Sequence, residues 1–219
     1  MSKLLIINAH PNFDSKTSAS LDVFNYFLKV YKENHSKDEV IEQINLYEDE
    51  VPLLDKNVLS AWGKQAEGKE LTSQEKKVTD RMSEILKQFK SANKYVIVYP
   101  MHNFNIPSKL KDYMDNIMIP RETFKYTETA ADNGRMSVGL INDGRSVVVI
   151  QASGSIYTNN DFYTEVEYSH KFLKSMFHLI GIEDYEIIRV QGVGVLDRNE
   201  VLQKGYKEAE EQALKLTTK

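Results

Sequence analysis

Short apolar runs and longer amphipathic segments follow one another along the whole chain. The runs of strand length cover residues 3–8, 39–45, 95–99, 146–151 and 185–190. Apolar residues at helical spacing occupy residues 21–31, 78–89, 110–117, 162–180 and 201–214. This alternation predicts an α/β fold, most simply a doubly wound, five-stranded parallel sheet of order 2-1-3-4-5 with helices on both faces.

Two stretches interrupt this alternation. Residues 46–71 are irregular and carry the only tryptophan, Trp62, in a polar context. We expect a long connection there that lines one side of a binding site, rather than a short loop. Thr72 and Glu75 then form a capping-box pattern, which predicts the start of a long helix. Residues 120–145 are again irregular, and we expect a mobile lid or a hairpin there.

Composition and charge narrow the class of protein. With 219 residues, 41% of them hydrophobic and 27% charged, the chain fits a single domain over residues 1–219, and it has no apolar run of membrane-spanning length. A net charge of −4 with mixed signs provides no basic face for nucleic acid. The chain has no cysteine and its five histidines are scattered, so neither a disulfide nor a metal site is expected. The N-terminus lacks a signal-peptide pattern, which favours the cytoplasm.

Hydroxyl side chains crowd the loop between the first strand and the first helix. Ser15, Thr17, Ser18 and Ser20 lie within six residues of one another. Helix capping explains one or two of them, but hydroxyls together with free N–H groups at a helix start also bind a phosphate dianion. The loop contains no glycine, so it is neither a Walker loop nor a G-x-G-x-x-G turn.

The loops after the third and fourth strands have a different composition. Residues 101–105 combine Met101, His102 and Phe104 with two asparagines, which suits a flat heteroaromatic ring with polar edges. A simple connector whose methionine and phenylalanine cap the core is the alternative. Residues 152–155 are small, so backbone N–H groups can approach the carbonyl edge of a planar ligand, although an ordinary glycine turn has the same pattern. In a parallel sheet all three loops open onto one edge, and a phosphorylated planar cofactor, FMN, fits them together.

Four stretches of the chain together resemble the FMN-dependent NADH azoreductase and quinone reductase family. They are residues 9–20, which begin Ala-His-Pro and end Ser-Ala-Ser, and residues 100–104, 123–128 and 139–140. The resemblance implies a flavodoxin-like fold, bound FMN, NADH as electron donor and a homodimer with each flavin at the subunit interface. It also implies ping-pong hydride transfer through FMN to a quinone or an azo compound.

The resemblance assigns roles to individual residues. It implies that Ser18, Ala19 and Ser20 bind the FMN phosphate with His10 nearby, that Met101, His102, Asn103 and Phe104 lie against the flavin ring, and that Ala152, Ser153, Gly154 and Ser155 lie at its carbonyl edge. A flat acceptor would be sandwiched by Trp62, Phe104, Phe124 and Phe162, the last from the partner subunit, with His102 as a further substrate contact. FMN carries the redox step, so no residue is expected to be an obligatory acid or base.

Three departures from the family pattern concern substrate preference and the flavin potential. His102 occupies a position that is often tyrosine or tryptophan in the family, Gly154-Ser155 replaces two glycines, and residues 130–136 look longer than usual. A flavodoxin-like electron carrier without a catalytic NADH site is the alternative function. A phosphoacceptor signalling domain of the same topology is excluded, because it needs an aspartate after the third strand, where this chain has Tyr99-Pro100-Met101.

Overall fold

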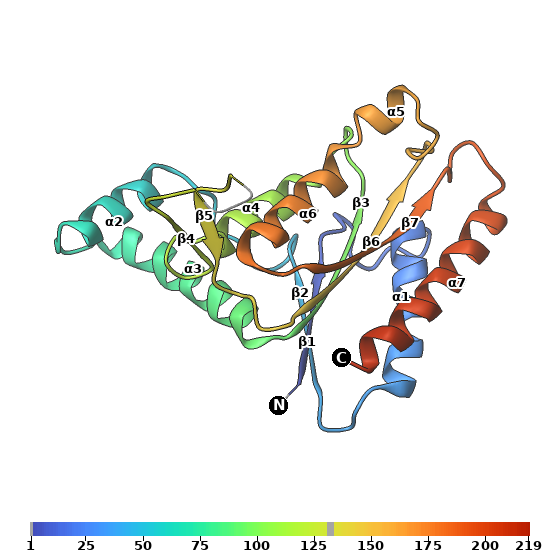
Figure 1. Ribbon diagram of the computed structural model, residues 1–219, viewed down its shortest axis with the longest axis horizontal. Helices are drawn as coiled ribbons and strands as arrows, with labels where there is room; N and C mark the ends of the chain where they lie inside the picture. The colour runs from blue at the N-terminus through green and yellow to red at the C-terminus, as the bar shows by residue number, and fades with distance from the viewer. Residues whose placement is uncertain (1, 131–133) are drawn as a thin grey trace.

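A five-stranded parallel sheet forms the centre of the molecule in the computed structural model, which describes residues 2–130 and 134–219 (Figure 1). Its strands are β1 (Lys3–Asn8), β2 (Val40–Asn45), β3 (Lys94–Pro100), β6 (Ser146–Ser153) and β7 (Asp184–Gln191). They lie in the order β2-β1-β3-β6-β7 with all neighbours parallel. The predicted order 2-1-3-4-5 is therefore confirmed.

Two helical layers cover the sheet. Helices α1 (Ala19–Asn34) and α7 (Arg198–Thr217) pack on one face, and α3 (Ser73–Ser91), α4 (Ser108–Ile117) and α6 (Tyr168–Ile180) pack on the other. Alternate residues of one strand enter opposite cores: Leu4 and Ile6 of β1 join the α1–α7 side, whereas Leu5 and Ile7 join the α3–α6 side. Strands buried on both faces read as continuous apolar runs, which explains why the sequence revealed them.

The irregular residues 46–71 contain a helix that the sequence did not predict. Helix α2 (Lys56–Ala66) begins at the N-cap Asp55 and lies beside α3. The predicted capping box is present, since Thr72 Oγ1 accepts from the Glu75 N–H at 3.3 Å and Glu75 Oε2 accepts from the Thr72 N–H at 2.8 Å. Glu75 also binds Lys64 of α2 at 2.7 Å, and this ammonium group, together with hydrogen bonds from Ser60 and Thr72, lowers the pKa of Glu75 to about 2.

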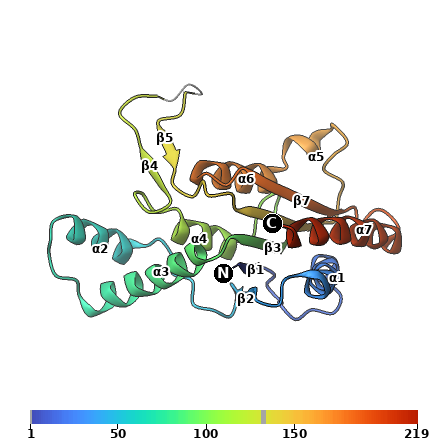
Figure 2. The same ribbon diagram turned by 60° about the horizontal axis from the view of Figure 1, so that its bottom comes forward.

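The described parts of residues 120–145 contain a hairpin, one of the two predicted alternatives. Strands β4 (Phe124–Tyr126) and β5 (Ser137–Gly139) pair in antiparallel fashion and project from the body beside α4 and α6 (Figure 2). A Cβ at Gly139 would lie 2.3 Å from the Ile180 carbonyl carbon, so only glycine lets the hairpin base approach the end of α6 so closely. Residues 131–133, within the stretch predicted to be unusually long, lie outside the described residues.

The predicted helix over residues 162–180 is wrong as a single element. The structure has a short helix α5 (Phe162–Glu165) and then α6, with the break at Val166 and Glu167. The break arises because the Glu167 side chain turns inward and caps α6, accepting from the His170 N–H at 2.9 Å. Strand β6 also continues two residues further than predicted, through Ala152 and Ser153, which pair with β7.

No helix within residues 2–130 and 134–219 is long and apolar enough to cross a membrane.

Candidate functional site

Three loops meet at the carboxyl edge of the sheet, as predicted. The Ala9 N–H donates to the Val98 carbonyl at 2.9 Å, and the Met101 N–H donates to the Ala152 carbonyl at 2.7 Å, so the ends of β1, β3 and β6 are in register. The imidazoles of His10 and His102 are near enough to interact: burial first, and then the neighbouring His102, lower the pKa of His10. The first and third strands therefore bring their loops to one place.

The loop after β1 presents a small cluster of hydroxyl and N–H groups at the start of α1. Ser18 is the N-cap, and its Oγ accepts from the Leu21 N–H at 3.4 Å and lies 3.0 Å from Ser20 Oγ. The first N–H groups of a helix have no partner within the helix, so those of Ala19 and Ser20 are suited to an anion. The structure thus brings the predicted phosphate residues together, with His10 at the beginning of the same loop. Ser18 is partly exposed, whereas Ser20 is fully buried.

Arg198 is a residue near this loop that the sequence did not indicate. It lies at the start of α7, and its Nη2 donates to the Thr17 carbonyl at 2.8 Å. The guanidinium thereby places a positive charge against the loop. Only the packing of α7 beside α1 creates this contact, so no local sequence pattern announces it.

The loop after β3 makes a tight and strained turn. His102 and Asn105 exchange two backbone hydrogen bonds, each 2.9 Å long, and the two residues between them, Asn103 and Phe104, have φ values of 47° and 65°. Left-handed backbone at two successive residues other than glycine is unfavourable, and such strain gathers at functional sites. We call residues 102–105 the ring turn.

The loop after β6 is anchored by the loop after β7. The Gly192 N–H donates to the carbonyls of Ser153 and Ser155 at 3.0 and 3.1 Å, and the Gly194 N–H donates to the Gly154 carbonyl at 3.0 Å. These contacts engage the carbonyl groups of the loop. A Cβ at Gly154 would meet no atom within 4 Å, so this backbone is open to a ligand.

An aromatic cluster adjoins the ring turn. Phe104 lies 6.4 Å from Tyr157 and 6.3 Å from Phe162 between ring centroids, both edge to face, and Tyr163 contacts both Tyr157 and Phe162. Phe162 is 62% exposed, which is unusual for a phenylalanine and leaves its ring free to contact a ligand. The resemblance implied that Phe162 reaches the acceptor from the partner subunit, which stays a prediction; within its own chain its ring lies beside that of Phe104.

Two predicted acceptor contacts lie elsewhere in the chain. Trp62 lines a cavity of about 600 Å³ between α2 and α3, together with Met82 and Leu86. Phe124 is 7% exposed at the base of the hairpin, where it packs edge to face on Tyr126. Figure 1 shows α2 and β4 at the end of the molecule away from α5. One chain therefore does not bring Trp62 and Phe124 to the aromatic cluster.

The described part of the chain contains no group of three or more histidine, aspartate or glutamate side chains placed to hold a metal ion.

These loops and strands define a protein of flavodoxin-like fold, and a family model of that description matches residues 2–213. The chain is 66% identical over 219 residues to FMN-dependent NADH:quinone oxidoreductase 1 of Bacillus cereus, with all of both chains covered. An enzyme of the same name from Lactiplantibacillus plantarum is 42% identical over 195 residues, which cover 88% of this chain and 87% of that one. The chain belongs to the family of FMN-dependent NADH:quinone oxidoreductases.

Solved structures agree with this assignment. A crystal structure of an FMN-dependent NADH-azoreductase from Bacillus anthracis in complex with FMN has a TM-score of 0.95 and 67% identity, covering 99% of this chain and 100% of the other. A second azoreductase structure, AzrA, has a TM-score of 0.86 at 28% identity and covers 98% of this chain and 100% of the other.

The residues present also fit FMN on chemical grounds. A dianion matches the hydroxyl and N–H groups at the start of α1, and a flat ring with polar edges matches the ring turn and the open backbone at Gly154.

Proposed function

We propose that this chain is an FMN-dependent NADH oxidoreductase that reduces quinones and cleaves aromatic azo compounds. The observation that carries the proposal is the convergence of three loops at one sheet edge, each suited to a different part of FMN. The 66% identical relative and the FMN-bound azoreductase structure support the same function.

The phosphate of FMN would bind at the start of α1. Ser18 and Ser20 supply hydroxyl donors, Ala19 and Ser20 supply helix-start N–H groups, and His10 lies at the beginning of the loop. Arg198, held on the Thr17 carbonyl, adds positive charge. Charge-assisted hydrogen bonds of this kind are about twice as strong as neutral ones.

The flavin ring would lie between the ring turn and the loop after β6. Met101, His102, Asn103 and Phe104 would contact the ring, with Asn103 and backbone amides bonding its polar edge. Ala152, Ser153, Gly154 and Ser155 would line the carbonyl edge, where backbone N–H groups stabilise negative charge. Because Ala152 and Ser153 belong to strand β6, this side of the site is rigid.

FMN, when bound, accepts a hydride from NADH and passes it to the acceptor. The chain's contribution is to bind, orient and exclude water, and we assign no obligatory acid or base to it. Phe104 and Phe162 form an aromatic wall on which NADH and the acceptor would stack in turn, and His102 would hydrogen-bond the substrate. Because NADH and the acceptor would use the same aromatic surface, they could not bind at the same time, and the kinetic mechanism would be ping-pong.

We also propose a homodimer of single-domain subunits. Trp62 and Phe124 are remote from the aromatic cluster of their own chain, so they would contact an acceptor only in the site of a partner subunit. Among the described residues of α2 and the hairpin, the exposed large apolar side chains are those of Leu59, Tyr126, Met136, Val138 and Leu140. Such residues favour burial against a second subunit. The cytoplasmic location stays a prediction.

Kinetics of the purified protein test the proposal against a flavodoxin-like electron carrier. The protein should be yellow, and NADH should bleach the flavin without air as fast as turnover requires. A quinone added afterwards should restore the colour, and initial-rate plots at several quinone concentrations should be parallel. A colourless protein that takes up no FMN contradicts the cofactor, and absent NADH turnover favours the carrier.

A further inference from the structure

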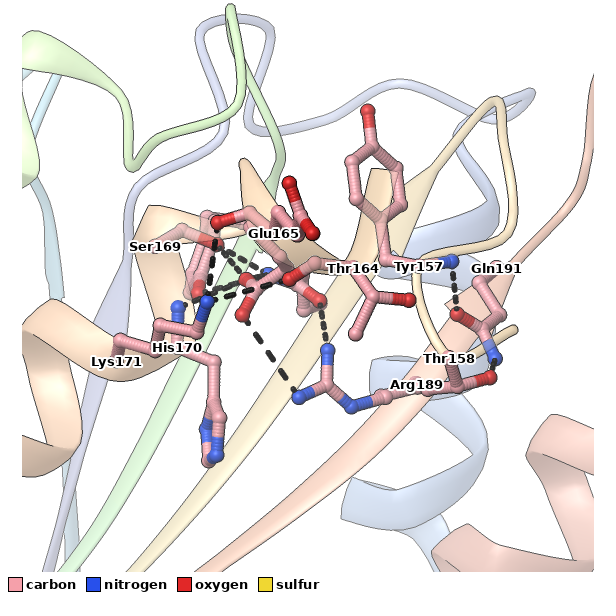
Figure 3. A network of polar contacts seen from close by, with 12 residues as sticks. Tyr157, Thr158, Thr164, Glu165, Ser169, His170, Lys171, Arg189 and Gln191 are labelled. Atoms are coloured by element: carbon pink, nitrogen blue, oxygen red, sulfur yellow. Dashed lines mark hydrogen bonds and ion pairs between the residues drawn. The ribbon is translucent and has the colours of Figure 1, made fainter. Parts of the chain in front are cut away.

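A buried carboxylate lies beneath the ring-binding loops and is absent from the function described above. Glu167, only 3% exposed, precedes α6. Its Oε1 accepts from Gln151 Nε2 at 3.1 Å, from Ser169 Oγ at 2.7 Å and from the His170 N–H at 2.9 Å, while Arg189 Nη2 lies 3.9 Å from Oε2. Figure 3 shows Ser169, His170 and Arg189 as members of one polar network. The carboxylate thus joins β6, β7 and the start of α6.

These contacts keep the group charged. Burial raises the pKa of Glu167, but the hydrogen bonds from Ser169, the His170 N–H and Gln151 outweigh burial and lower the pKa overall. A buried charge is tolerated only where donors surround it, so the geometry of this network is sharply specified.

One backbone hydrogen bond connects the Glu167 network to the ring turn. Tyr168, the first residue of α6, donates its N–H to the Phe104 carbonyl at 3.0 Å. Phe104 is one of the two left-handed residues of the ring turn, and its side chain contacts Phe162 of α5, directly before the break. Glu167 therefore fixes the position of the N–H group that holds a strained backbone in place.

We propose that Glu167 is a positioning residue for the flavin ring. It sets the start of α6, so that the Tyr168 N–H holds Phe104, and through it the ring turn, in the conformation that binds the ring. This inference rests on the proposed function only in taking FMN as the ligand. A left-handed turn without this hold relaxes to commoner backbone conformations, and the apparent affinity falls by the fraction of molecules that remain competent.

The chain offers a matched control at the other end of the sheet. Glu39 is also a buried carboxylate, 7% exposed, and it accepts from Tyr31 OH at 2.6 Å and pairs with Lys94 at 2.9 Å. It lies before β2, far from the ring-binding loops. Removing the charge of Glu39 should lower the stability of the protein, because a buried carboxylate and its partners are lost there too, but it should leave the conformation of the ring turn unchanged.

The experiment measures binding of riboflavin and FMN to the apoprotein by quenching of flavin fluorescence, with thermal unfolding recorded in parallel. Glu167→Gln should weaken both ligands by the same factor, on the order of tenfold, because the loss concerns the ring and not the phosphate. Glu39→Gln should lower the melting temperature and leave both affinities at the wild-type value. Ser169→Ala, which removes one donor to Glu167 and leaves the charge, should give a smaller, parallel loss if Glu167→Gln does not fold.

Wild-type riboflavin affinity in both Glu167→Gln and Ser169→Ala overturns the proposal. An equal loss in Glu39→Gln also overturns it, since the effect would then be general instability. Failure of the proposed function gives a different result, because the wild-type protein itself would then bind no flavin or would bind it without oxidising NADH.

Discussion

Two buried carboxylates occupy opposite ends of the same sheet and differ in what surrounds them. At the amino end Glu39 is closed off by Tyr31 of α1 and Lys94 of β3, all of them at most 7% exposed. At the carboxyl end Glu167 also has buried partners, but the helix that it caps holds an exposed, strained turn. Similar chemistry thus stabilises the core at one end and a binding surface at the other, because ligands of open parallel sheets bind outside the carboxyl ends of the strands.

The largest expected effect concerns the amino end. Lys94→Met removes the cation beside Glu39 and leaves a buried charge unpaired, which should lower the free energy of unfolding by about 3–5 kcal/mol. The melting temperature should fall by roughly 10 °C or more. Calorimetry of the apoprotein measures this change, and riboflavin affinity at a temperature where the variant is folded should equal that of wild type.

The exposed pair of Lys90 and Glu122 provides the control for this prediction. Its atoms lie 2.7 Å apart, but both side chains are 41% exposed or more. Lys90→Met should therefore cost about 1 kcal/mol or less. An equal loss in the two lysine variants would mean that burial does not set the energy of the Glu39 network.

A smaller but selective effect is expected at the phosphate loop. Ser18→Ala combined with Ser20→Ala removes two charge-assisted hydrogen bonds, each worth about 1.5–3 kcal/mol, and should weaken FMN at least tenfold. Riboflavin, which lacks the phosphate, should bind as before. Titration of the apoprotein with both ligands measures the difference.

Ser15 and Thr17 serve as matched controls in the same loop. Their hydroxyls lie 3.4 Å apart and are more distant in sequence from the start of α1. Replacing both with alanine should leave FMN affinity unchanged. If this variant loses as much FMN affinity as the Ser18 and Ser20 variant, the phosphate binds closer to Ser15 and Thr17 than proposed here.

A still smaller effect is expected from relieving strain in the ring turn. Asn103→Gly suits the φ value of 47°, so stability should change by about 1 kcal/mol or less, while a freer turn and the loss of the Asn103 side chain from the ring edge should together weaken riboflavin a few-fold. Asn160, with φ 57° outside the ring turn, is the matched position. Asn160→Gly should have a similar effect on stability and none on riboflavin, and weaker riboflavin in both variants would argue against a specific role of the turn.

The sequence revealed the strand order and the loops, because strands buried on both faces and the loops that follow them are local patterns. It did not reveal the Glu167 network. Gln151 reads as the last residue of an apolar run and Glu167 as a surface position of one long helix, and only the approach of β6, β7 and α6 buries both. The roles proposed for Trp62 and Phe124 involve contacts between subunits, and such contacts leave no local pattern in a sequence.

The smallest expected effect is a pH dependence that separates the two carboxylates. The pKa of both Glu167 and Glu39 is lowered in the folded protein, so the stability that each contributes is present above the unfolded pKa near 4.5 and is lost as pH falls through the folded value. Melting temperature should therefore fall below about pH 4.5, and less steeply in either glutamine variant. The groups facing Glu167 are Arg189, which stays charged, and His170, whose pKa burial lowers. Three tyrosines also face it, and burial raises the pKa of each: Tyr99, Tyr157 and Tyr185. Neutral riboflavin, titrated from pH 6 to the lowest pH at which the protein is folded, should bind wild type and Glu39→Gln with constant affinity until the pH falls below about 4.5, where Glu167 begins to take up a proton and the affinity drops. In Glu167→Gln the affinity should be weak and nearly independent of pH. The same slope in all three proteins would assign the effect to another group and leave Glu167 with a purely structural role.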